Sequence, residues 1–189
     1  MITKIIAGVD EVGRGPLAGP VVAAAVVLPN TYELLGLADS KRLSERQREN
    51  LYAAIYQQAT AVAIGVASVA EIDTINIFHA SLLAMQRALQ ALVIKPTHTQ
   101  IDGKYCPMFD AENQAFIKGD TYIPAIMAAS IIAKVTRDRW MMELEHQYPG
   151  YGFAQHKGYP TQQHMQALKR LGVTPIHRTS FAPVKACLS

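Results

Sequence analysis

The alternation of apolar and polar segments along the chain predicts an α/β fold with a mixed sheet. Runs of β-branched and small apolar residues have the length of buried strands in four places: 2–9, 21–28, 61–68 and 99–102. Phe116 and Ile117 form a fifth, shorter candidate. Tight turns or one helical excursion join the first three strands, which favours an antiparallel meander.

Helices are predicted where apolar residues recur every three or four positions or follow a capping residue: 44–58, 78–92, 122–146 and 161–171. Ser44 and Gln47 form a capping box that begins the first of them. The early part of the long third helix is rich in small residues, such as Ala128 and Ala129. We expect this part to lie close to the sheet, because small side chains allow a near approach. Gly172 ends the last helix.

Composition narrows the class of protein. Half of the 189 residues are apolar and 17% are charged, which excludes a disordered or collagen-like chain. The longest apolar run, 21–28, is too short to span a membrane. Asp10 and Glu11 interrupt the N-terminal apolar run too early for a secretory signal. Cys106 and Cys187 are too few for a disulfide scaffold, so we expect a cytoplasmic protein with two free thiols.

The distribution of charge is uneven. We expect one domain over residues 1–189, with a core at about 1–146 and a basic helical part at about 147–189, because no repeat or linker divides the chain. The net charge is only +3, yet no Asp or Glu occurs from His146 onward, where five Lys or Arg residues and four of the six histidines lie. This asymmetry indicates a polyanionic partner, although a solvated basic tail has the same composition.

Four acids stand where predicted strands end or a helix begins: Asp10, Glu11, Asp102 and Asp120. Strand ends are where α/β proteins build their sites, and converging carboxylates repel one another unless cations such as Mg²⁺ or Mn²⁺ bind. Adjacent strand residues point to opposite faces. Glu11 therefore joins Asp10 only if the strand ends before it, as the turn at Gly13 suggests. An isolated Asp-Glu pair is otherwise a solvated strand end.

Other segments carry residues suited to a phosphate backbone. In Gly13-Arg14-Gly15 the glycines leave backbone amides free for a ligand, and Arg14 can reach a phosphate; a structural tight turn has the same pattern. Lys41 either reaches a phosphate or belongs to a plain helix entry. Positions i, i+4 and i+7 of the long helix put three polar side chains on one stripe, suited to flanking phosphates: Ser130, Lys134 and Arg137.

Aromatic residues lie among the basic ones near the C-terminus. Tyr159 stands between Gly158 and Pro160. These neighbours restrict the backbone and favour a displayed ring, which is able to stack on a base or a sugar. Tyr151 and Phe153 suit packing in the core instead.

Together these motifs resemble the type 2 ribonuclease H family. The resemblance spans residues 6 to about 185 and rests on blocks that occur in the family's order: 10–20, 39–41, 101–103, 118–120, 128–138 and 156–161. It implies a ribonuclease H-like fold, in which a five-stranded mixed sheet is flanked by helices and followed by a C-terminal helical extension. We expect the chain not to belong to the related type 3 enzymes, which carry a long N-terminal extension before these blocks.

The resemblance also implies an activity, the hydrolysis of the RNA strand of RNA–DNA hybrids, including single ribonucleotides embedded in duplex DNA. Cleavage gives 5′-phosphate and 3′-hydroxyl ends and uses two Mn²⁺ or Mg²⁺ ions. The residues that match the catalytic, metal-holding acids of the family are Asp10, Glu11, Asp102 and Asp120. The residues that match its ribose-reading turn and its sugar-packing tyrosine are Gly13, Arg14, Gly15 and Tyr159.

We expect a monomer that binds such hybrids. Two other interpretations stay open. Related folds host nucleases that act on DNA alone, and a non-enzymatic module could bind hybrids without cutting them. The four acids speak against the second interpretation, because a binder of polyanions gains nothing from clustered negative charge.

Overall fold

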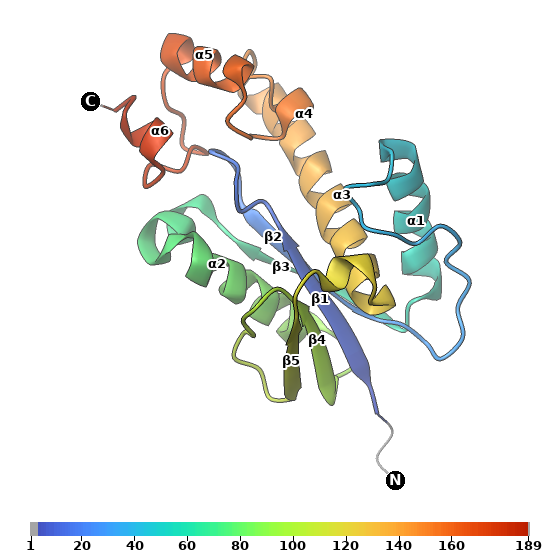
Figure 1. Cartoon of the computed structure of the whole chain (residues 1–189). Coiled ribbons are helices and arrows are strands. Elements are labelled where there is room, and N and C mark those ends of the chain that lie inside the picture. Colours follow the sequence, from blue (N-terminus) through green and yellow to red (C-terminus); the bar gives the residue numbers. More distant parts are fainter. Residues whose placement is uncertain (1–3, 189) are drawn as a thin grey trace.

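A computed structural model describes residues 4–188 and contains a five-stranded mixed sheet between helices (Figure 1). The strands are β1 (Ile6–Val12), β2 (Val21–Val27), β3 (Ala61–Ala67), β4 (His98–Asp102) and β5 (Glu112–Phe116). Their order is β3-β2-β1-β4-β5. The first three pair antiparallel, whereas β4 is parallel to both β1 and β5. The predicted meander and mixed sheet are therefore confirmed.

Two of the five strands differ from the prediction by more than one residue. The first strand begins at Ile6, and it continues to Val12 because pairing with β2 extends to Val22; the predicted residues 2 and 3 lie outside the described part of the chain. The fifth strand occupies 112–116 and not 116–117. Its sequence is mostly polar and it lies at the edge of the sheet, so the apolar pattern marks only its last residue.

The predicted helices are present, with one longer than expected. They are α1 (Glu45–Gln58), α2 (Val69–Ala91), α3 (Pro124–Gln147) and α5 (Gln162–Leu171). A capping box of Ser68 and Glu71 begins α2 before the predicted start. Asn76, at φ 66°, kinks the helix, and its side chain accepts hydrogen bonds from the amides of Phe78 and His79. The apolar pattern therefore marks the part of α2 that follows this kink.

Helices cover both faces of the sheet, with α2 on one and α1 and α3 on the other (Figure 1). A Cβ atom at Gly8 on β1 would lie 2.1 Å from the Ala125 carbonyl carbon of α3. Glycine at this position therefore lets helix and strand touch. Ala128 and Ala129 are fully buried between them, which confirms the close packing that the small residues predict.

The C-terminal segment packs onto the rest of the fold. Two short helices, α4 (Phe153–His156) and α6 (Ala182–Lys185), and the 3₁₀ helix η1 (Gly119–Thr121) complete the elements. Tyr151 and Phe153 are buried against Ala18 and Met141, as predicted for packing residues.

No helix within residues 4–188 combines the length and apolar character that crossing a bilayer requires.

Candidate active site

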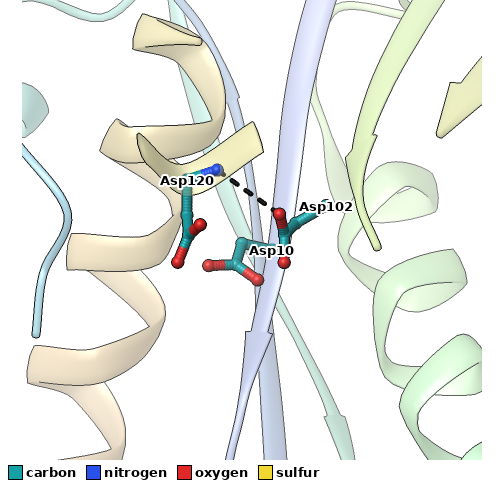
Figure 2. A group of neighbouring side chains, drawn as sticks. All are labelled: Asp10, Asp102 and Asp120. Atoms are coloured by element: carbon teal, nitrogen blue, oxygen red, sulfur yellow. Dashed lines mark hydrogen bonds between the residues drawn. The ribbon is translucent and has the colours of Figure 1, made fainter. Parts of the chain in front are cut away.

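Three aspartates from separate elements come together at one end of the sheet (Figure 2). Asp10 lies on β1, Asp102 ends β4 and Asp120 lies on η1, and one carboxylate oxygen of each is within 4.8 Å of the others. The parallel pairing of Val9 with Ile101 brings the first two side by side. The Asp120 amide donates to Asp102 Oδ1 at 3.3 Å, which holds η1 against the end of β4.

Burial and repulsion oppose ionisation in this group. The pKa of Asp10 is raised well above its usual value, chiefly by burial and then by the charges of Glu11 and Asp102, while a hydrogen bond from Ser130 acts in the opposite direction. Burial also raises the pKa of Asp102, and the charge of Asp120 adds to the effect. The group therefore favours a proton or a cation that neutralises it.

Glu11 enters the site differently from the prediction. The strand does not end before this residue, so the expected reason for its orientation is wrong. However, β1 pairs with β4 only as far as Val9. Glu11 lies two residues beyond this last pair and lines the same pocket as Asp10. Its Oε1 accepts a hydrogen bond from Arg14 at 3.3 Å, whereas Oε2 is buried without a hydrogen-bond partner among the described residues. Burial raises the pKa of Glu11, and Arg14 counteracts this.

One pocket joins residues that are far apart in the sequence: Asp10, Glu11, Val12, Ser40, Lys41, Ser130, Lys134 and Tyr159. Six of these were predicted site residues. Val12 and Ser40 were not, and Ser40 has a clear structural role. Its buried hydroxyl lies 2.9 Å from that of Ser130, which links the loop before α1 to α3. The link places Lys41 beside the aspartates.

The two pocket lysines each contact an acid. Lys41 Nζ donates to Asp120 Oδ2 at 3.1 Å, although the lysine side chain remains 77% exposed. Burial acts to lower the pKa of Lys41, but Asp120, Asp10 and Asp39 together outweigh it and the net shift is upward. Lys134 pairs with Asp138 at 2.9 Å. Both lysines line the pocket, each with its ammonium group paired to an acid in the free protein.

Arg137 is not at the surface, and its predicted phosphate contact is wrong. The side chain is fully buried, and its guanidinium donates to the carbonyls of Ala18, Pro20 and Lys157 at 2.9–3.0 Å. Burial lowers its pKa to about 10. Ser130 and Lys134 on α3 do line the pocket, as predicted. Arg137 lies on the same face of the helix, but the loop after β1 covers it.

Sequence analysis missed the role of a second buried arginine, Arg178. Its guanidinium donates to the carbonyls of Gly13, Arg14 and Gly19 at 2.6–3.1 Å. Burial and the nearby Arg137 lower its pKa to about 9. In the sequence, this residue is one of the basic residues near the C-terminus. Its spacing does not indicate a contact with a loop more than 150 residues away.

The two arginines fix the turn that carries Gly13 and Gly15. Gly13 has φ 95°, and a Cβ atom there would lie 2.3 Å from Arg137 Nε. A Cβ atom at Gly15 would lie 3.2 Å from the ring of Tyr159. That ring is 39% exposed, which confirms the predicted display, and it borders the pocket. The turn, the tyrosine and the acids thus adjoin one another.

Comparison with known proteins gives a consistent result. The family model described as Ribonuclease HII matches residues 7–184. A Ribonuclease HII of Myxococcus xanthus (strain DK1622) is 57% identical over 184 residues, which cover 97% of this chain and 63% of that protein. A Ribonuclease HII of Coxiella burnetii (strain Dugway 5J108-111) is 57% identical over 181 residues, covering 96% and 90%. The crystal structure of the ribonuclease H2 from Pyrococcus horikoshii OT3 matches with TM-score 0.84 and 30% identity, covering 97% and 96%.

Proposed function

The chain belongs to the ribonuclease HII family of RNA-strand endonucleases, and we propose that it hydrolyses the RNA strand of RNA–DNA hybrids, including a single ribonucleotide within duplex DNA. The observation that carries this proposal is the group of three aspartates, two of them buried and Asp102 half-buried, which adjoins an exposed tyrosine and a glycine turn. Carboxylates serve the phosphodiester chemistry, and the turn and ring suit recognition of a sugar.

The four acids of the site, Asp10, Glu11, Asp102 and Asp120, fit hard divalent cations. All their candidate ligand atoms are oxygens, which Mg²⁺ and Mn²⁺ prefer. Asp10 and Asp102 resist ionisation while no cation neutralises them, and Glu11 has a buried oxygen free to coordinate. We propose that Asp10, Glu11, Asp102 and Asp120 would hold two such ions. Such a pair of ions, when bound, activates a water and stabilises the leaving oxygen.

The other pocket residues orient the substrate in this proposal. Lys41, Ser130 and Lys134 surround the acids and suit phosphates on either side of the cleaved bond. Lys41 pairs with Asp120 in the free protein, so its ammonium group becomes available when another cation neutralises that acid. Arg14, half exposed next to Glu11, is placed to contact a phosphate.

Selection of RNA requires a contact to the 2′-hydroxyl group. Backbone groups of Gly13, Arg14 and Gly15 are suited to it, because the turn adjoins the pocket and is held from behind by two arginines. We propose that the Tyr159 ring packs on the neighbouring sugar, where a 2′-hydroxyl would crowd it. Water attack with the 3′ oxygen as leaving group gives the proposed 5′-phosphate and 3′-hydroxyl ends.

We also propose that residues 1–189 act as one domain and as a cytoplasmic monomer. The segment after α3 shares buried clusters with residues 17 and 18, which supports a single domain. Both cysteines are free, which suits a reducing compartment. Sedimentation of the purified protein, with and without substrate, tests the monomer.

The proposed function is tested with three duplexes: all DNA, DNA with one ribonucleotide, and a long RNA–DNA hybrid. Each is incubated with Mg²⁺, Mn²⁺ or a chelator, and Asp10→Asn protein prepared identically controls for contaminating nucleases. We expect metal-dependent cuts in the second and third duplexes only. Cleavage of all-DNA duplex would favour a DNA nuclease, and tight hybrid binding without cleavage would favour a binding module.

A further inference from the structure

Three histidines lie behind the loop that carries Tyr159, and the proposed function uses none of them. His164 on α5 and His177 are buried, and His156 stacks on His164 with ring centroids 4.6 Å apart. The His164 and His177 rings also contact Phe153, at centroid distances of 5.3 and 5.7 Å. Buried imidazoles need hydrogen-bond partners, and the partners here form a continuous chain.

The first link of this chain fixes the protonation of His177. The backbone amide of Thr174 donates to His177 Nδ1 at 3.1 Å. An amide cannot accept in return, so Nδ1 carries no proton and the neutral ring bears its proton on Nε2. The Thr174 hydroxyl, 2.8 Å from the same Nδ1 atom, then donates to it as well. That atom lies 3.1 Å from His164 Nε2 and donates to it.

The second link follows from the first. Because His164 Nε2 accepts, the proton of the neutral His164 ring is on Nδ1. This atom lies 3.0 Å from the carbonyl oxygen of Tyr159 and donates to it. Burial lowers the pKa of both rings, that of His177 to about 4, so both are neutral near pH 7. The order of donors thus runs from Thr174 through two imidazoles to Tyr159.

His156 holds the adjacent peptide in the same manner. Its Nδ1 accepts from the amide of Gly158 at 3.2 Å, so its Nε2 donates to the carbonyl of Tyr151 at 2.8 Å. The carbonyl of Gly158 in turn accepts from the amide of Leu17, in the loop that follows β1. Imidazoles therefore fix the backbone on both sides of the Tyr159 Cα atom, and that backbone is tied to the glycine-turn loop.

We propose that His164, oriented by His177, is a positioning residue that sets the place of the Tyr159 ring in the pocket and thereby favours a ribonucleotide followed by DNA over continuous RNA. This inference rests on the proposed function, because it assumes that Tyr159 packs on the substrate sugar. His164 itself does not line the pocket. It acts on the Tyr159 ring through its hydrogen bond to the Tyr159 carbonyl oxygen.

The test compares His164→Phe with His164→Asn. Phe keeps a ring but donates nothing, whereas the Asn amide nitrogen takes the place of Nδ1 and can still donate to Tyr159. The measured quantity is kcat/KM on the single-ribonucleotide duplex divided by kcat/KM on the long hybrid. We expect Phe to lower this ratio roughly 2- to 12-fold, the net worth of one hydrogen bond. We expect Asn to stay within about twofold of wild type, and His146→Phe, at an exposed site on α3, to leave the ratio unchanged.

A double variant separates positioning from general damage. In a Tyr159→Ala background, His164→Phe should lower the ratio no further, since the ring it positions is gone. An additional loss there would overturn the proposal. A ratio that His164→Phe leaves unchanged, in protein whose melting curve shows that it is folded, would also overturn it.

The protonation states are measured independently of cleavage. Nitrogen-15 NMR of the wild-type imidazoles at pH 7 should show neutral His177 protonated on Nε2 and neutral His164 protonated on Nδ1. The opposite tautomers, or charged rings, would overturn the relay even if no variant folded. Failure of the proposed function looks different, because the wild-type protein would then cut no ribonucleotide-containing duplex while the NMR signature remained.

Discussion

Two groups of buried charge adjoin the turn at Gly13, and they differ in how their hydrogen-bonding capacity is met. The guanidinium groups of Arg137 and Arg178 donate to backbone carbonyls of the loop, and that of Arg137 also to the carbonyl of Lys157. The carboxylates of Asp10 and Asp102 instead lie beside other carboxylates, and burial raises the pKa of both. Buried charge with its partners in place supports the fold, whereas buried charge in need of a counter-ion marks a site for chemistry.

The largest effect is expected from Asp10→Asn, which changes the acidic group. It removes the negative charge of a side chain that we propose would hold the cations, so we expect kcat on the hybrid to fall on the order of 10³-fold, as several kcal/mol of charge stabilisation is lost. Hybrid affinity should stay the same or rise, because less negative charge faces the phosphates. Single-turnover cleavage and a binding titration measure the two effects. Near-normal cleavage would remove Asp10 from the site.

Arg178→Met changes the group of buried arginines and should destabilise the folded protein. The carbonyls of Gly13 and Gly19 lose their donors while buried, and we expect the free energy of unfolding to fall by about 2–4 kcal/mol. Arg170→Met, at an exposed site on α5, should change it by no more than about 0.5 kcal/mol. Urea unfolding of both variants measures the difference. Equal effects would show that the tail arginines are interchangeable surface charges.

Divalent cations should distinguish the two groups of buried charge, because they bind the acidic group and not the arginines. Mg²⁺ at ten times its dissociation constant should raise the free energy of unfolding by about 1.4 kcal/mol. The gain should be smaller in Asp10→Asn and intact in His146→Phe, which lies away from the acids. Thermal melts in chelator and in Mg²⁺ measure it. A gain of equal size in Asp10→Asn would place the bound ion elsewhere.

The buried histidines predict a smaller, pH-dependent effect. The pKa of His177 is near 6.5 when unfolded and about 4 when folded, so the unfolded chain binds more protons between these values. Stability should therefore be complete above about pH 6.5, decline by about 1–2 kcal/mol by about pH 5.5, and continue to fall toward pH 4. His177→Gln, whose amide can still donate to His164, should flatten this decline in urea unfolding measured across the range. An unaltered slope would assign the acid sensitivity to other groups.

The sequence predicted those features that local patterns encode. Apolar runs indicated the meander of β1 to β3, and strand ends indicated the acids. The polar edge strand β5 and the kink at Asn76 left no such pattern. Arg137 shares a helical stripe with Lys134, and no local rule reveals that a distant loop covers one and not the other. Arg178 and the histidine relay escaped prediction because their partners come from other segments of the chain.

The contact from Arg178 to Gly13 has a consequence for the order of folding. It joins residues 165 positions apart, and contacts of such separation carry a large loop-closure entropy. The antiparallel pairing of β1 with β2 is far more local and should form early. A partly folded chain would then possess its first strand and Asp10 before the glycine turn is fixed. We expect the sugar-reading geometry to be completed among the last parts of the molecule, so that selectivity is acquired only when both ends of the chain have met.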